Sequence, residues 1–148
     1  MMFFGEYRYT LDPKGRVSVP GRLREVLINK YQEVLVVTKD FDQCLVGYPL
    51  EEWSRILEKA KSLPMTDPSV KQFSRHVIAA AMECPLDKQG RILVPPNLRT
   101  FAKLNKEVVL LGMDYKIEIW DYKQWKEKEE QINQSRVEIS SALASLGL

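Results

Sequence analysis

The 148-residue sequence has few of the side chains on which catalytic and metal sites depend, with one histidine and two cysteines. Cys44 and Cys84 lie far apart and belong to no Cys-x-x-Cys pair, so we expect reduced thiols rather than a disulfide or a zinc site. His76 falls on a predicted helix beside Phe73 and Val77, as a packing or surface residue would. No nucleophile elbow, phosphate-binding loop or metal-ligand cluster is found. The sequence therefore predicts no enzyme, no cofactor and no metal.

Long apolar runs are also missing, and net charge is low. The sequence contains no run of 18 apolar residues, so it predicts no transmembrane helix. The N-terminus does not have the pattern of a signal peptide, so we expect a cytoplasmic protein. The net charge is only +2, yet segments 1–24 and 84–103 each carry a net charge of +3. A local basic surface on a nearly neutral protein indicates a polyanionic partner.

Those two basic segments contain the same motif. Positions 11–20 and 86–95 share the skeleton Leu-Asp-x-x-Gly-Arg-[Val/Ile]-x-Val-Pro, and Leu-Arg follows both copies, at 23–24 and 98–99. All matched positions are offset by 75, which indicates an internal duplication.

Each motif predicts a strand, a tight turn, a second strand and a short helix. Asp-Pro-Lys-Gly in the first copy is a strong turn signal, and the second copy keeps the Asp and the Gly. Segment 3–11 is predicted to be the first strand of the first hairpin. The turns would present Lys14 and Arg16 in one copy, and Lys88 and Arg91 in the other.

The remaining elements follow in the same order within each half. We expect helices at 22–29, 49–62, from Asp67-Pro68 onward, at 97–103 and after Asp121, and strands at 33–38, 44–48, 107–111 and 116–120, with a turn at 112–114. Asp67 and Asp121 are predicted to cap the helices that follow them. The three tryptophans, Trp53, Trp120 and Trp125, are interpreted as core anchors. From about residue 126 the tail is predicted to be helical, with an apolar stripe that packs either on its own domain or on another subunit. The stripe consists of Ile132, Ile139, Leu143 and Leu146.

These elements predict four regions: a first repeat at 1–63, a connecting helix at 64–83, a second repeat at 84–125 and the tail at 126–148. Neither half would be a good folding unit alone, because each has short strands and little helix. Pairing them would bury both sets of strands in one pseudo-symmetric barrel or sandwich and bring the two turns to one surface.

The motif resembles the swapped-hairpin, or looped-hinge, DNA-binding half-barrel of the AbrB superfamily. Two copies in one chain resemble the MraZ family of bacterial regulators, as do the opening Phe-x-Gly-Glu-Tyr-x-x-Thr-Leu-Asp and the Asp-Gln-Cys-Leu segment at 42–45. The resemblance implies an α+β fold: a pseudo-twofold duplicated β-barrel of two AbrB-like half-barrels with flanking helices. It also implies a nucleoid-associated regulator that binds direct repeats in promoter double-stranded DNA, upstream of its own division and cell-wall operon, as a ring-shaped homo-oligomer.

The resemblance carries the Asp-x-x-x-Arg motifs over to Asp12 with Arg16 and to Asp87 with Arg91. An arginine on a rigid turn can donate a bidentate pair to guanine or contact phosphate, and lysine suits phosphate. The expected DNA-binding residues are Arg8, Lys14, Arg16, Arg24, Lys88, Arg91 and Arg99, and the expected turn-supporting residues are Asp12, Gly15, Asp87 and Gly90. The aspartate and arginine of each motif could instead pair with each other and only brace the turn.

Two other functions remain open at this point. A duplicated fold with a helical tail would also suit an oligomeric scaffold that binds no DNA. An AbrB-type antitoxin-like module uses the same half-barrel, although such chains usually combine one half-barrel with a disordered tail. Binding to DNA at moderate salt would separate the regulator from the scaffold.

Overall fold

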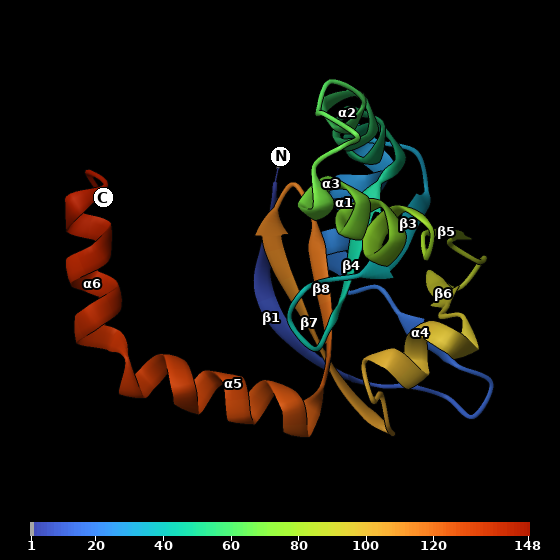
Figure 1. Cartoon of the computed structure of the whole chain (residues 1–148). Helices are drawn as coiled ribbons and strands as arrows, with labels where there is room; N and C mark the ends of the chain where they lie inside the picture. Colours follow the sequence, from blue (N-terminus) through green and yellow to red (C-terminus); the bar gives the residue numbers. More distant parts are fainter. Residues whose placement is uncertain (1) are drawn as a thin grey trace.

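A computed structural model describes residues 2–148 and shows an α+β fold built on one six-stranded antiparallel sheet and a separate two-stranded ribbon (Figure 1). The first half contains β1 (Phe3–Thr10), β2 (Arg16–Ser18), α1 (Gly21–Lys30), β3 (Val34–Lys39), β4 (Leu45–Pro49) and α2 (Leu50–Lys61). After α3 (Pro68–Phe73) and η1 (Ser74–Ile78) come β5 (Met82–Pro85), β6 (Arg91–Leu93), α4 (Pro96–Phe101), β7 (Glu107–Asp114), β8 (Ile117–Asp121), α5 (Tyr122–Gln134) and α6 (Arg136–Ser145).

The strand order has the symmetry that the duplicated sequence predicts. The sheet runs β1-β7-β8-β4-β3-β5, so each strand of one repeat occupies the position that mirrors its counterpart in the other. In the β2–β6 ribbon Val17 stands opposite Ile92, and these two residues are 75 positions apart. A pseudo-twofold axis therefore passes beside this pair, and the predicted duplicated α+β fold is confirmed.

The predicted hairpin between segment 3–11 and the next strand is wrong, because the repeats exchange partners. β1 pairs with β7 along its whole length, from Phe3 opposite Asp114 to Thr10 opposite Glu107, and β2 pairs with β6. The exchange lets the three-residue strands β2 and β6 contribute Val17 and Ile92, each 1% exposed, to a core that both repeats share. Neither repeat could bury these residues with its own strands alone.

The shared core lies on one face of the sheet, and two smaller clusters lie elsewhere. It joins buried residues of β1, β7, β8, β3 and β4 to the β2–β6 ribbon, α1 and α4. A second cluster gathers around Trp53 of α2 and Val77 of η1. In a third, Trp120 covers Val109 and Leu111 of β7, with Trp125 packed against it at 5.6 Å between ring centroids. The predicted core role of Trp53 and Trp120 is confirmed, since they are 7% and 4% exposed.

Two local predictions differ from the structure. No turn forms at 112–114, because β7 continues to Asp114 and the chain reverses at 115–116, where Met113 N–H donates to the Lys116 carbonyl (2.8 Å). Asp67 caps its helix as predicted, accepting from Ser69 N–H at 2.8 Å. That helix then changes at Ser74 into the π-helix η1, in which the Ala79 N–H donates to the Ser74 carbonyl (2.9 Å).

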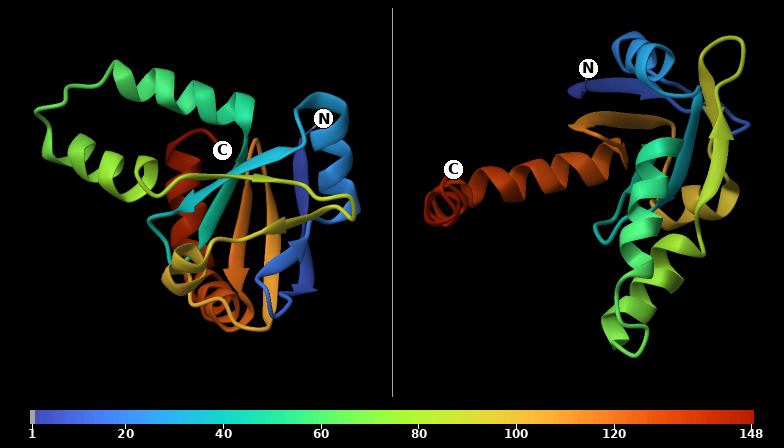
Figure 2. Two further views of the ribbon diagram at one scale, coloured as in Figure 1. Left: turned by 90° about the vertical axis from the view of Figure 1, so that its right-hand side faces the viewer. Right: turned by 90° about the horizontal axis from the view of Figure 1, so that it is seen from above.

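The C-terminal tail leaves the body of the protein. Asp121 caps α5 through the N–H groups of Lys123 and Gln124 (3.1 and 3.3 Å), and the chain bends at Ser135 into α6. Figures 1 and 2 show α5 running away from the sheet and α6 standing apart from it. No residue of α5 or α6 is buried, so the stripe at 132–146 does not pack on its own domain. In residues 2–148 no helix has the length and apolar character that crossing a membrane requires.

Gly112 lets β1 and β7 approach closely, and we expect Gly112→Ala to destabilise the protein. A Cβ at this position would lie 2.5 Å from the Phe4 nitrogen and 2.7 Å from the Phe3 carbonyl carbon, which are backbone atoms that cannot rotate away. Overpacking of this kind costs about 1–3 kcal/mol in the free energy of unfolding, measurable by urea denaturation. The control is Gly21→Ala, where the nearest atom is 3.8 Å away. Equal midpoints for both variants would contradict this account.

Candidate nucleic-acid interface

The first repeated turn is held by one aspartate. Asp12 Oδ1 accepts from the backbone N–H groups of Lys14 (2.9 Å) and Arg16 (2.8 Å), and Oδ2 accepts from Arg16 Nε (2.7 Å). Gly15 N–H donates to the Asp12 carbonyl (2.9 Å) and closes the turn. The pKa of Asp12 lies below its ordinary value, chiefly because Arg16 N–H donates to the carboxylate, with the Arg16 guanidinium adding to the effect.

The second turn repeats this arrangement bond for bond. Asp87 Oδ1 accepts from the N–H groups of Gln89 and Arg91, both at 2.9 Å, and Oδ2 accepts from Arg91 Nε, also at 2.9 Å. Its pKa is lowered for the same reasons, with the Arg91 N–H as the main cause. The loss of the proline found in the first copy leaves this hydrogen-bond pattern unchanged.

Each motif arginine is oriented by its aspartate, which uses only part of the hydrogen-bond donors of the guanidinium. Among residues 2–148, Arg16 and Arg91 each donate to a carboxylate side chain through Nε alone. The Nη1 and Nη2 groups, which form the bidentate edge of a guanidinium, remain available to an outside acceptor. Bracing of the turn and contact with a ligand are therefore compatible in the same arginine.

The two other motif arginines cross from one repeat to the other. Arg99 of α4 lies over Gly15, and Arg24 of α1 lies over Gly90. Both glycines have positive φ, at +90° and +75°, and a Cβ on either would run into the guanidinium above it. In the sequence each of these arginines belongs to its own repeat, whereas in the structure each one covers the turn of the other repeat.

Arg24 and Arg99 also have hydrogen-bonding capacity to spare. Their Nε atoms are buried without an acceptor among residues 2–148, and neither guanidinium makes an ion pair there. Buried polar groups without partners are uncommon and call for an explanation. A negatively charged ligand on the surface over the glycines would attract both guanidinium groups.

The β2–β6 ribbon connects the two turns and presents a largely polar outer face. Val17 and Ile92 point into the core, so Arg16, Ser18, Arg91 and Leu93 lie on the opposite face of the ribbon. Leu93 is 56% exposed. Sequence reasoning missed Ser18 and Leu93, although the alternation in Arg-Val-Ser-Val and Arg-Ile-Leu-Val was sufficient to place them outward.

The remaining predicted contacts fall into two groups. Lys14 and Lys88 are exposed at the two turns, beside the motif arginines. Arg8 stands in the middle of β1, where it forms an ion pair with Glu107 (2.7 Å) and lies 3.8 Å above the Tyr122 ring. The structure thus joins Lys14, Arg16 and Arg99 around one turn and Lys88, Arg91 and Arg24 around the other, and leaves Arg8 outside both.

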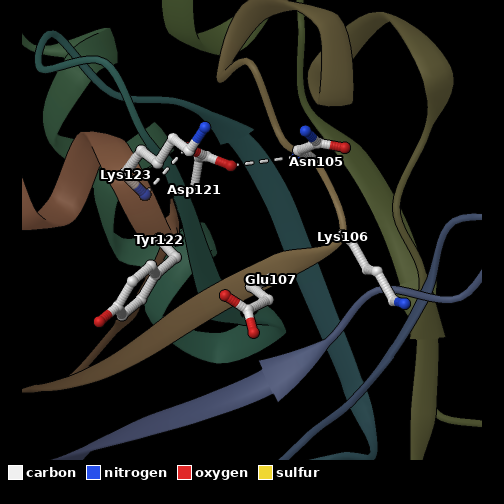
Figure 3. Close-up of a pocket in the computed structure, with 6 residues that line it drawn as sticks. All are labelled: Asn105, Lys106, Glu107, Asp121, Tyr122 and Lys123. Carbon is white, nitrogen blue, oxygen red and sulfur yellow. Dashed lines mark hydrogen bonds between the residues drawn. The ribbon is translucent and has the colours of Figure 1, made fainter.

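A cleft of about 270 Å³ near Arg8 offers no catalytic constellation (Figure 3). Its lining contains no histidine, cysteine or serine, and consists of Asn105, Lys106, Glu107, Asp121, Tyr122 and Lys123. Asp121 is occupied as a helix cap and also accepts from the Asn105 N–H (3.2 Å). Glu107 is paired with Arg8. These side chains stabilise the junction of β7, β8 and α5.

One partly buried group of possible metal ligands is found in the described part of the chain. Asp40, Cys44 and Glu118 place ligand atoms within 4.8 Å of one another. Cys44 Sγ donates to Asp40 Oδ2 (3.7 Å), and Glu118 accepts from Trp120 Nε1 (2.9 Å). Burial is the main cause that raises the pKa of the Cys44 thiol, and the nearby carboxylates add to it, so the thiol stays protonated. Each of the three side chains thus has a hydrogen-bond partner in the protein, and we assign no metal to them.

The aspartate braces should make the turns sensitive to acid. Because their folded-state pKa values are lowered, Asp12 and Asp87 stabilise the protein fully above the unfolded pKa of about 3.9, and this contribution is lost as pH falls through the folded value. We expect Asp12→Asn/Asp87→Asn to melt below wild type at pH 7, with the difference shrinking below pH about 4. Thermal melts followed by circular dichroism would measure this. A difference that is constant with pH would contradict the bracing role.

Comparison with known proteins agrees with the duplicated architecture. The family described as "MraZ protein, putative antitoxin-like" matches the chain twice, at residues 2–76 and 77–145. A protein of Acetivibrio thermocellus named "Transcriptional regulator MraZ" is 44% identical over 147 residues, which cover 99% of this chain and 100% of the relative. A protein of Heliobacterium modesticaldum with the same name is 45% identical over the same coverage. With both halves matched and full-length relatives above 40% identity, the chain belongs to the MraZ family.

Proposed function

We propose that this protein is a transcription regulator that binds promoter double-stranded DNA through its two aspartate-braced turns and the β2–β6 ribbon between them. The observation that carries the proposal is the pair of arginine forks, Arg16 and Arg91, fixed by carboxylates on one exposed ribbon. The relatives' name, transcriptional regulator, supports the same function.

The ribbon suits the major groove. That groove is about 12 Å wide and admits a two-stranded β-ribbon, on which outward side chains reach base edges. Arg16 and Arg91 would donate to guanine O6 and N7 through their free Nη edges, and Leu93 would contact a thymine methyl group. Lys14 and Lys88 at the turn tips would contact the flanking phosphates.

Arg24 and Arg99 are proposed to contact phosphate as well. Each lies over a glycine whose missing side chain leaves room for the guanidinium against the turn. Arg8 would contribute less than these six residues, because Glu107 already neutralises it.

We propose further that the protein acts as a homo-oligomer with the ring shape that the family resemblance implies. The ring would bind direct repeats upstream of its own operon, in the nucleoid of the cytoplasm. Two small turns make few contacts per protomer. Linking several protomers converts each later contact into an intramolecular one, which raises the overall affinity without any new contact.

The direct experiment measures binding of the protein to a DNA fragment from upstream of its own gene, against a scrambled fragment, across a salt series. We expect Arg16→Ala and Arg91→Ala each to lose about fivefold or more in affinity, since a bidentate base contact is worth about 1–3 kcal/mol. Lys59→Ala, on the exposed face of α2, removes one positive charge away from the turns and should bind as wild type does. If the arginine variants keep the oligomer and bind DNA as wild type does, the arginines only brace the turns and the proposal is wrong.

Phosphate and base contacts can be separated by the salt dependence. Lys14→Ala should weaken binding to both fragments equally and reduce the slope of log affinity against log salt by about 1. Arg16→Ala should reduce the preference for the upstream fragment. If the wild type shows no preference at moderate salt, the oligomeric scaffold or the antitoxin-like module becomes the better interpretation.

A further inference from the structure

The two turns are alike inside but differ in the charges that surround them. Just before the first turn, the Leu11 N–H donates to the Lys106 carbonyl (2.8 Å), and just before the second, the Leu86 N–H donates to the Glu33 carbonyl (3.0 Å). These two bonds are equivalent under the pseudo-twofold symmetry, so Lys106 and Glu33 occupy matching places, and both side chains are exposed. The same backbone position therefore carries a positive charge beside the first turn and a negative charge beside the second.

A second lysine, Lys103, stands in the segment that joins α4 to β7. The chain reverses there with a φ of +55° at Lys103, whose N–H donates to the Thr100 carbonyl (3.1 Å), and the Leu104 N–H donates to the Arg99 carbonyl (3.0 Å). The left-handed residue at the end of a helix is most often glycine, because a Cβ is disfavoured in this conformation. The backbone would be less strained with glycine, so the turn itself gives no reason for a lysine at this position.

Both lysines line hollows that adjoin the first turn. One hollow, of about 610 Å³, extends from Asp12 and Pro13 of the turn to Lys106. The other, of about 440 Å³, contains Arg99 and Lys103 in its lining. The lining residues common to both are Leu11, Leu104 and Asn105. Figure 3 shows the Lys106 side chain directed away from the other five residues of the neighbouring cleft. A continuous surface thus leads from the first turn and its covering arginine to the two lysines.

The positive charge on this surface is not neutralised within the chain. Among residues 2–148, neither Lys103 nor Lys106 makes an ion pair or a side-chain hydrogen bond. The carboxylate of Asp12, which lines the same hollow as Lys106, is already held by Arg16. Glu107, the next residue after Lys106, is paired with Arg8. Uncompensated charges beside a proposed phosphate contact attract a polyanion.

We propose that Lys103 and Lys106 contact the sugar-phosphate backbone of DNA bound at the first turn, and that Glu33 prevents the equivalent contact at the second turn. The inference rests on the proposed function and adds two phosphate contacts to it. The ammonium group of lysine is a compact charge with three donors on a flexible stem, which suits phosphate and carries no base specificity.

The difference between the turns gives each protomer a direction on the DNA. Two turns related by a twofold axis would contact the duplex in the same way in either orientation, as symmetric proteins do on palindromic sites. Additional phosphate contacts at one turn make the two orientations unequal in affinity. Direct repeats, in which every site points the same way, require a protein with this asymmetry.

Binding across a salt series tests the two lysines. Lys103→Gly and Lys106→Ala should each weaken binding to the upstream and the scrambled fragment by the same factor, and reduce the slope of log affinity against log salt by about 1. Lys103→Gly should melt at or above the wild-type temperature, because glycine adopts positive φ without strain, so weaker binding cannot be ascribed to unfolding. The control is Lys123→Ala, across the neighbouring cleft from Lys106 in Figure 3, which should bind as wild type does.

Glu33→Lys tests the asymmetry by placing a lysine at the matching position of the second repeat. It should strengthen binding to both fragments and make the salt slope steeper by about 1. Unchanged binding in Glu33→Lys would overturn the asymmetry. If Lys103→Gly and Lys106→Ala bind as wild type does while Arg16→Ala loses affinity, this inference alone is wrong. A wild type that binds neither fragment would overturn the proposed function and this inference together.

Discussion

The exchange of strands between the two repeats is the constraint on which the rest of the molecule depends. β2 pairs with β6 across the pseudo-twofold axis, and Val19 and Val94 donate their N–H groups to the carbonyls of Gly90 and Gly15 at 2.9 Å. Each turn is thus tied by the backbone of the other repeat and covered by the other repeat's arginine. The two turns form one rigid unit, although they are 75 positions apart in sequence.

The hydrogen bonds inside each turn orient the arginine side chain more than they stabilise the fold. Arg16 and Asp12 are partly exposed, with side chains 33% and 28% accessible, and ion pairs at such sites contribute little to stability. Their effect is to hold a long, flexible side chain in one orientation before any ligand arrives. Less side-chain entropy is then lost on binding, so a small surface can be more selective.

Local sequence signals predicted the local features well. The Asp-x-x-Gly spacing predicted the turns, Asp67 and Asp121 were identified as caps, and Trp53 and Trp120 were identified as core residues. Pairing was the part that the sequence did not reveal, because alternation shows which side of a strand is buried but not which strand lies beside it. For that reason the β1–β7 ladder and the crossing of Arg24 and Arg99 were missed. Gly112 was mistaken for a turn residue because close backbone approach and tight turns both select glycine.

The reciprocal turns also determine when, during synthesis, a complete surface can exist. Chains emerge from the ribosome N-terminus first, so β1, β2 and α1 appear before any of their partners in the second repeat. The first turn lacks Arg99 until α4 has emerged, and β1 lacks a neighbour until β7 follows. A nascent or truncated chain therefore carries the residues of the first turn without the arginine that covers the turn and without the strand that pairs with β1.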